Sequence, residues 1–353
     1  MARDLASRGA QLIILTQQPL SDPFFVDYIL DLRNATDNQL ITAEHVDLSS
    51  LHSVRTFATK WIDNVPPRRL DMIILCANTF TPPGGKAVPT VDGIEPTWAV
   101  NYLGHFHLLS ILSPAIRAQP PDRDVRIIFG TCSSYMGGQL PDFIKKTTPA
   151  GKSKSKSSAQ SSASATAAAI PSVSPYATSK FALTTFALAF QTYIWAYDRP
   201  DKNPMNARVI LVDPGLSRTP GTRRFLTFGS LWGLFLYLVM WPFWWLVLKS
   251  PEQGAQSFLT AAMEAQFGRG EGGWLIKECR QVEMLRKDCK DVECQKELWE
   301  GSEAMIEILE KEGAMKRARE KKEKEAEEEE KARSAAKAAS AEKQPGSRRS
   351  RKA

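Results

Sequence analysis

The sequence predicts an α/β fold of the doubly wound, Rossmann-like kind, in which a parallel sheet carries helices on both faces. Over residues 1–215, short apolar runs rich in β-branched residues alternate with longer amphipathic stretches. Strands and helices in this order form βαβ units with right-handed crossovers. The apolar runs also lack the polar alternation of a half-exposed strand, which indicates strands buried on both faces.

The individual elements follow from these patterns in chain order. Strands are expected at residues 11–15, 40–46, 70–75, 125–130 and 207–212. Helices are expected near residues 24–35, 51–64, 94–117 and 174–197. A further helix is expected to begin at Pro251, because Ser250 is a suitable N-cap and proline is favoured at the first helical position.

Composition divides the chain into a core and three other segments. Residues 1–224 and 250–299 are expected to form the core, interrupted by an apolar segment at 225–249. Residues 145–170 consist mainly of Ser, Ala and Lys, so they cannot bury enough apolar surface to offset their ordering entropy, and a surface insertion is expected. Residues 300–353 are rich in Glu, Lys, Arg and Ala, which predicts a charged helix that frays into a disordered tail.

The net charge of +7 does not by itself indicate nucleic-acid binding. Much of it lies in Lys145–Lys156 and after Lys311, in low-complexity segments rather than on a folded face. A solvated loop and tail are favoured over a surface for acidic lipid or nucleic acid, and no nucleic-acid partner is expected. The five cysteines lack CxxC spacing and no histidine lies near Cys279–Cys294, so we expect free thiols and no metal site.

Phe225–Leu248 is a run of 24 residues without a charge, long enough to cross a bilayer as one helix. It lies, however, between the last predicted core strand and the helix at Pro251, which pack on the same sheet, so a single crossing would divide one domain. With Gly229, Gly233 and Pro242 as breaks, we expect a bent segment that dips into one lipid leaflet and returns. The alternative is an apolar lid over the substrate site.

Two motifs are expected to carry chemistry. The stretch "SPYATSK" places Tyr176 and Lys180 four residues apart at the start of a predicted helix, so both lie on one face. A cationic lysine stabilises a phenolate and lowers the tyrosine pKa towards that of a general acid or base. Ser133 and Ser134 follow the strand at 125–130, at the sheet edge where ligands bind, and either could hold a substrate carbonyl or hydroxyl.

In this order, the motifs resemble the short-chain dehydrogenase/reductase family over about the first 265 residues. They look most like its retinol-dehydrogenase-like branch, which includes fungal lipid-droplet oxidoreductases. The resemblance implies that Tyr176 exchanges the proton of the substrate hydroxyl, and that Lys180 lowers the tyrosine pKa and binds the nicotinamide ribose. It makes the catalytic serine Ser134 or Ser133.

The resemblance also implies a nicotinamide cofactor, with NADP placed ahead of NAD. The position that distinguishes them falls near Thr16–Gln18, which is neither basic nor acidic, so both stay open. Asn101, in "NYLGHF", is implied to hold a water that extends the proton relay. The implied cofactor-binding residues, from "VDLSS", "LCAN", "SPYATSK" and "DPGLSRT", are Asp47, Leu48, Asn78, Tyr176, Lys180, Pro214, Gly215 and Thr219.

The family's phosphate-binding loop, TGxxxGIG after the first strand, has no counterpart in this sequence. In the strand order 3-2-1-4-5-6, the first strand is central. Without it, the strands at 11–15 and 70–75 are expected to have unpaired inner edges. Two accounts stay open: a truncated gene model of an active enzyme, which we favour, or a short protein that has lost cofactor binding.

The expected function is a membrane- or lipid-droplet-associated, NAD(P)-dependent oxidoreductase that interconverts hydroxyl and carbonyl on a sterol, retinoid or other lipid. The expected location is the endoplasmic reticulum membrane or a lipid droplet, with the catalytic domain facing the cytosol, and a homodimer is a further expectation. The alternative is a catalytically inactive, truncated member that acts as a scaffold or lipid-surface binding protein.

Overall fold

The computed structural model describes residues 1–64, 68–82, 87–142, 144 and 174–342. The insertion expected at 145–170 and the end of the expected tail therefore lie outside the described residues. The chain divides into a core unit, Met1–Glu307, and a second unit that begins at Ile308.

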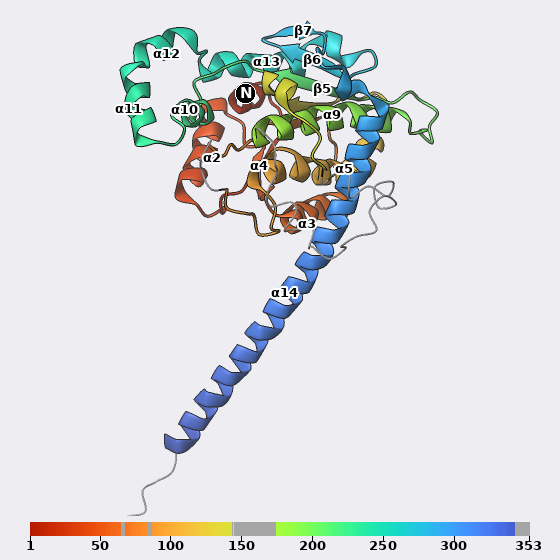
Figure 1. Ribbon diagram of the computed structural model, residues 1–353. Coiled ribbons are helices and arrows are strands. Elements are labelled where there is room, and N and C mark those ends of the chain that lie inside the picture. Colours follow the sequence, from red (N-terminus) through yellow and green to blue (C-terminus); the bar gives the residue numbers. More distant parts are fainter. Residues whose placement is uncertain (65–67, 83–86, 143, 145–173, 343–353) are drawn as a thin grey trace, which may run out of the picture. The chain divides into compact units, whose positions relative to one another are not determined.

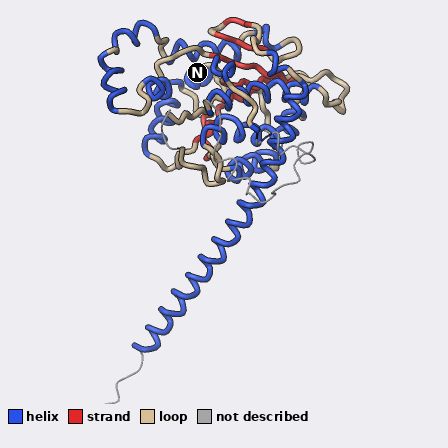
Figure 2. The backbone as a smooth tube through the Cα atoms, in the orientation of Figure 1, coloured by secondary structure: helices blue, strands red, loops and turns tan. Residues whose placement is uncertain are grey.

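The strands of the described residues form two sheets (Figure 2). The smaller pairs β1 with β2 in parallel, and the larger has the order β3-β4-β5-β6-β7, parallel except for β7. Their bounds are β1 Leu12–Thr16, β2 Ile41–His45, β3 Met72–Leu75, β4 Val125–Gly130, β5 Ala207–Asp213, β6 Trp274–Lys277 and β7 Arg280–Val282. The five predicted strands form, whereas β6 and β7 were not predicted. The expected burial on both faces holds for β4 and β5 but is wrong for β1, β2 and β3, which are only partly buried.

Strands β1 and β3 each have one edge that pairs with no other strand in the described part of the chain. Strand β1 pairs only with β2, and β3 pairs only with β4. This confirms the unpaired inner edges that the sequence predicts. The gap falls at the switch point of the doubly wound order, where a dinucleotide binds in folds of this class.

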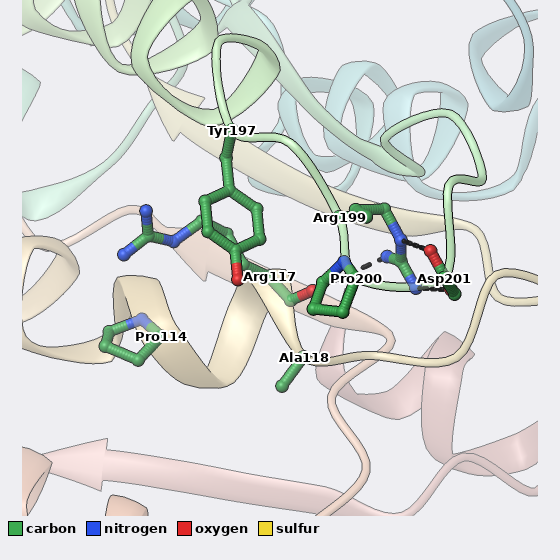
Figure 3. A pocket seen from close by; sticks show the side chains of 7 residues that line it. All are labelled: Pro114, Arg117, Ala118, Tyr197, Arg199, Pro200 and Asp201. Carbon is green, nitrogen blue, oxygen red and sulfur yellow. Dashed lines mark hydrogen bonds and ion pairs between the residues drawn. The ribbon is translucent and has the colours of Figure 1, made fainter.

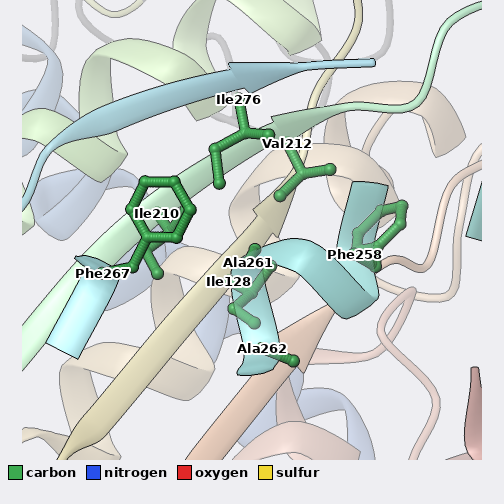
Figure 4. Packing of buried hydrophobic residues seen from close by; sticks show 8 residues of the cluster. All are labelled: Ile128, Ile210, Val212, Phe258, Ala261, Ala262, Phe267 and Ile276. Carbon is green, nitrogen blue, oxygen red and sulfur yellow. The ribbon is translucent and has the colours of Figure 1, made fainter. Parts of the chain in front are cut away.

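Helices cover both faces of the larger sheet (Figure 1). Ile128 of β4 and Ile210 of β5 pack with Phe258 of α13 on one face (Figure 4). On the other face, Phe129 of β4 meets Phe186 of α9, with ring centroids 6.0 Å apart. Neighbouring residues of β4 are thus buried on opposite faces, as a fully apolar strand requires. The helices α5, α9 and α13 span Gly104–Arg117, Pro175–Trp195 and Pro251–Met263.

The other predicted helices also form. Their bounds are α2 Pro23–Thr36, α3 Leu51–Ile62 and α4 Pro96–Trp98, preceded by α1 Ala2–Ser7 and followed much later by α14 Val292–Glu342. The helix expected at 94–117 is interrupted by a π-helical turn, Ala99–Leu103. The predicted start of α13 is confirmed, because Ser250 and Gln253 form a reciprocal capping box.

The apolar run folds as three short helices, α10 Pro220–Leu226, α11 Leu231–Val239 and α12 Trp241–Val247. None of the helices in the described ranges has the length and apolar character needed to cross a membrane. The first break contains Phe228 and Gly229, both with positive φ, and the second lies at Met240. The chain segments before and after these three helices meet, because Ser217 and Lys249 form a parallel β-bridge. The chain thus leaves and rejoins the core at one place (Figure 1).

Candidate active site

The first turn of α9 brings Tyr176 and Lys180 to the carboxyl end of β4. The helix begins because Ser174 caps it, accepting a hydrogen bond from the Ala177 N–H, with proline at the first helical position. Lys180 is buried, and its Nζ donates to the carbonyl oxygen of Gly130 over 3.0 Å. The strand end and the helix face therefore meet as the motif spacing predicts.

The expected lowering of the tyrosine pKa is wrong for this arrangement. Burial raises the pKa of Tyr176, and the neighbouring Cys132 raises it further. Burial also lowers the pKa of Lys180. The Lys180 ammonium lies 5.8 Å from the centre of the Tyr176 ring and is directed to the Gly130 carbonyl, so it does not stabilise a phenolate. Tyr176 is therefore a protonated phenol at neutral pH.

The hydroxyl of Tyr176 contacts two other side chains. Asn78, from the loop after β3, donates its Nδ2–H to the hydroxyl over 3.3 Å. Cys132, from the end of β4, places its Sγ 3.6 Å from the same oxygen. Asn78 was among the predicted cofactor-binding residues, whereas Cys132 was not identified from the sequence.

Neither predicted serine contacts the tyrosine hydroxyl. Ser133 donates to Asp213 Oδ2 over 2.6 Å and accepts a hydrogen bond from Lys277 Nζ over 3.1 Å. Ser134 is exposed, in the 3₁₀ turn Ser133–Gly137. The sequence also missed Asp213, although a carboxylate at the end of an otherwise apolar strand was a usable signal, because buried carboxylates need partners.

Asp213 connects the Ser133 network to the predicted nicotinamide loop. Its side chain is 4% exposed, and its Oδ1 accepts a hydrogen bond from the Gly215 N–H over 2.9 Å. Gly215 has φ +73°, and a Cβ there would lie 2.6 Å from an oxygen of Glu278. The turn at Pro214–Gly215 therefore depends on glycine and on the Asp213 carboxylate.

Asn101 joins the loop after β3 to α9. It is fully buried in the π-helical turn, a feature often found at functional sites. Its Nδ2 donates to the Thr79 carbonyl over 3.0 Å and to Ser179 Oγ over 3.1 Å, while its Oδ1 accepts from the Thr79 N–H over 2.7 Å. Both amide hydrogens are thus engaged, so in this structure the Asn101 side chain positions the loop that carries Asn78.

The remaining predicted cofactor residues lie in turns. Asp47 accepts the Ser49 N–H over 2.9 Å in the turn before α3. The carbonyl of Leu48 lies 2.6 Å from where a Cβ at Gly104 would be, so this turn packs directly on the start of α5. Thr219 caps α10 by accepting from the Thr222 N–H over 3.3 Å.

These residues fit the nicotinamide and ribose half of a dinucleotide but not its phosphates. In the described residues the Lys180 ammonium has one recorded hydrogen bond, to Gly130, which leaves two N–H donors for ribose hydroxyls. For the pyrophosphate, the sequence has no glycine-rich loop between a strand and a helix. In this fold such a loop follows the central strand. The gap between β1 and β3 lies at that position.

An aromatic contact connects the tyrosine to the apolar segment. The Phe80 ring meets Tyr176 edge-on at 5.5 Å between centroids. Phe225, at the end of α10, also contacts Phe80, with 5.5 Å between ring centroids. Beside them, a Cβ at Gly229 would lie 3.1 Å from Pro82. The first part of the apolar segment therefore packs on the loop that borders Tyr176.

A surface pocket lies at the opposite edge of the sheet, at the carboxyl ends of α5 and α9 (Figure 3). Arg199 pairs there with Asp201 at 2.7 Å and donates to the carbonyl of Gln119 over 2.9 Å. The Arg117 guanidinium lies 4.5 Å from the centre of the Tyr197 ring. These charges hold the loop after α9, and the pocket is separate from the Tyr176 site.

Two adjacent glycines provide a test of how the 3₁₀ turn is held against α9. A Cβ at Gly138 would overlap the Ala177 carbonyl and lie 2.5 Å from Phe181 Cβ, whereas a Cβ at Gly137 would have no neighbour closer than 4.0 Å. Gly138→Ala is expected to lower the free energy of unfolding by about 1–3 kcal/mol through overpacking. Urea denaturation measures this, with Gly137→Ala as the matched control. Equal stability of the two variants would contradict the packing.

Comparison with known proteins gives close and distant relatives, while no protein-family model matches the chain. An uncharacterized oxidoreductase of Schizosaccharomyces pombe is 44% identical over 321 residues, which cover 90% of this chain and 80% of that protein. Retinol dehydrogenase 14 of Mus musculus is 29% identical, over 78% of this chain and 70% of that protein. The solved structure of L-sorbose reductase from Gluconobacter frateurii, complexed with NADPH, shares the fold with a TM-score of 0.51 at 17% identity, over 78% of this chain and 88% of that chain.

Proposed function

Because the chain belongs to the short-chain dehydrogenase/reductase family, we propose that it is an NAD(P)-dependent oxidoreductase that interconverts hydroxyl and carbonyl on a lipophilic substrate at a lipid surface. The observation that carries this proposal is the continuous aromatic contact from Tyr176 through Phe80 to Phe225. It connects the tyrosine ring to the apolar segment, so the site has an apolar border on that side. The retinol dehydrogenase relative supports a lipophilic alcohol or its carbonyl product.

In this proposal the residues of the protein transfer the proton and orient the cofactor. When bound, the nicotinamide supplies or accepts the hydride. Tyr176 donates its hydroxyl proton to the carbonyl oxygen during reduction and accepts it back during oxidation. Lys180 is assigned to the ribose, through the two N–H donors that its hydrogen bond to Gly130 leaves.

The apolar segment is proposed to attach the protein to the endoplasmic reticulum membrane or to a lipid droplet, with the catalytic domain facing the cytosol. Its outward side chains are unusually exposed for a folded core, with Leu231, Trp232 and Leu246 at 85%, 78% and 79%. Exposed apolar surface of this kind marks an interaction site. Because Ser217 and Lys249 are bridged, both ends of the segment stay on one side of the lipid surface.

The test of the function is turnover with matched substrates of different polarity. The protein is expected to oxidise NADPH or NADH with lipophilic ketones and aldehydes, and to reduce the oxidised cofactor with the corresponding alcohols. Short water-soluble carbonyls are expected to be poorer substrates in kcat/KM. Equal rates for both classes would contradict the lipophilic site, and no turnover with either cofactor would contradict the enzyme.

The unpaired edges of β1 and β3 favour a second candidate function, a catalytically inactive scaffold or lipid-surface binding protein. The two candidates differ in nucleotide binding. Titration calorimetry of the protein with NADPH and NADH distinguishes them. Binding of either nucleotide supports the enzyme, and binding of neither supports the scaffold.

A further inference from the structure

We propose that the lipid surface bound by the apolar segment is one with negatively charged phospholipid headgroups, and that Arg218, Arg223 and Arg224 contact those headgroups. The inference rests on the proposed function, because it names the headgroup chemistry of the same lipid surface. An apolar segment alone binds charged and uncharged lipid surfaces equally, whereas cations at its base favour an anionic one.

The first argument is the charge of this part of the chain. Residues 216–249 contain Arg218, Arg223, Arg224 and Lys249, and neither Asp nor Glu. The chain as a whole has 46 basic and 39 acidic residues, so this stretch is unusually one-sided in charge. Positive charge without nearby carboxylates in the same stretch attracts a negatively charged surface.

The second argument is where the cations lie. The Arg218 N–H donates to the Lys249 carbonyl over 2.9 Å, so the chain before α10 and the chain after α12 are adjacent. Arg223 and Arg224 lie in the last turn of α10, next to Phe225, which packs on the loop beside the active site. The uncharged helices α11 and α12 project beyond α10 (Figure 1). When α11 and α12 enter the acyl region, cations at their base are at the depth of the headgroups.

Arg218 shows how a cation is held at the border of the apolar surface. Its guanidinium lies 5.6 Å from the centre of the Trp245 ring, and its Nη1 donates to the Trp245 carbonyl over 3.5 Å. Trp245 is 62% exposed, and tryptophan is favoured at the boundary between headgroups and acyl chains. A guanidinium has five N–H donors and binds phosphate through two parallel hydrogen bonds. The pair therefore marks the level at which a headgroup phosphate is expected.

The arginines, rather than the lysine, are available for this contact. Lys249 pairs with Glu278 at 3.0 Å, which neutralises its charge. No ion pair of the described residues involves Arg218, Arg223 or Arg224. Arg223 and Arg224 are also exposed. Three guanidinium groups at the base of an exposed apolar surface thus complement a layer of anionic headgroups.

Flotation of the full-length protein with two kinds of vesicle tests the proposal. One consists of phosphatidylcholine alone and the other contains about 30% phosphatidylserine. The wild-type protein is expected to bind the second about 100-fold more tightly, and Arg223→Gln combined with Arg224→Gln is expected to lose about 30-fold on that vesicle alone. The preference is expected to disappear in about 1 M NaCl, where the Debye length is about 3 Å.

Two further double variants are the controls. Arg223→Lys combined with Arg224→Lys retains the charge and is expected to retain the preference for phosphatidylserine. Arg317→Gln combined with Arg319→Gln removes the same charge from two exposed arginines of α14 and is expected to bind like the wild-type protein. Equal loss in the two glutamine variants would contradict the role of α10 and indicate non-specific attraction by the whole protein.

The comparison of the two vesicles with wild-type protein needs no variant, so the proposal stays testable if a substitution disturbs folding. Equal binding of both vesicles by the wild-type protein would overturn the headgroup preference and leave the proposed lipid attachment intact. Binding to neither vesicle would overturn the lipid attachment itself. Turnover of a lipophilic ketone, measured separately, tests the enzyme function.

Discussion

Tyr176→Phe is expected to lower kcat by about 10²- to 10⁴-fold, the usual contribution of a positioned general acid or base. The substitution removes only the hydroxyl. The ring remains, with its edge-on contact to Phe80 at 5.5 Å, so the fold and the affinity for nucleotide are expected to be retained. Steady-state kinetics with a lipophilic ketone measure the rate, and titration with NADPH measures the affinity.

The matched control is Tyr193→Phe, the same substitution near the other end of α9. Tyr193 is 38% exposed and packs on Trp299, far along the helix from the reacting hydroxyl, so its turnover is expected to stay at the wild-type level. If Tyr176→Phe retained more than half of the wild-type kcat, the tyrosine would not be the proton donor.

Trp232→Ser combined with Leu246→Ser is expected to lower the partition coefficient onto lipid by about 10²-fold or more. Each exposed side chain that enters the acyl region contributes about 1.5–3 kcal/mol, and 1.4 kcal/mol corresponds to a tenfold change. The two residues lie on α11 and α12 and are 78% and 79% exposed, so their replacement leaves the core packing intact. Flotation with phosphatidylcholine vesicles and with phospholipid-coated triacylglycerol droplets measures the partition on both kinds of surface.

Phe24→Ser combined with Leu285→Ser is the control for the lipid experiment. These side chains are 86% and 76% exposed and lie outside the apolar segment, so the loss of surface hydrophobicity is comparable. The control is expected to float like the wild-type protein. Equal loss in both double variants would indicate non-specific adhesion, and no loss in either would indicate that the segment is a lid over the substrate.

The main elements could be predicted because their signals are local. Buried parallel strands read as continuous apolar runs, and helix starts such as Ser174–Pro175 and Ser250–Pro251 carry their own capping signals. Strands β6 and β7 could not be predicted in the same way. They are four and three residues long, and β6 is defined by its pairing with β5 on one side and β7 on the other.

The positions of site residues could be predicted where they follow from spacing along the sequence. The directions in which their side chains point could not. Tyr176 and Lys180 share a helix face whatever the surroundings. The Ser133 hydroxyl, by contrast, bonds to Asp213 of β5 and Lys277 of β6, so its direction depends on strands that the spacing of the motif does not contain. The direction of the tyrosine pKa was likewise set by burial in the folded core, which the spacing of the motif does not contain.

Sequence and structure agree on the break between the two sheets. The absence of a TGxxxGIG motif predicts two unpaired strand edges, and β1 and β3 have them. That gap is the dinucleotide position of this fold. The structure therefore brings Tyr176 and Lys180 together but offers no glycine-rich loop for the phosphates.

The central claim is that Tyr176 serves hydride chemistry on a lipophilic carbonyl. The most direct measurement is isotope transfer from NADPH or NADH carrying deuterium at both C4 positions of the nicotinamide to a lipophilic ketone, followed by mass spectrometry of the product alcohol. Transfer by the wild-type protein and its loss in Tyr176→Phe are the predicted result. An alcohol without deuterium, or no alcohol with either cofactor, would contradict the account.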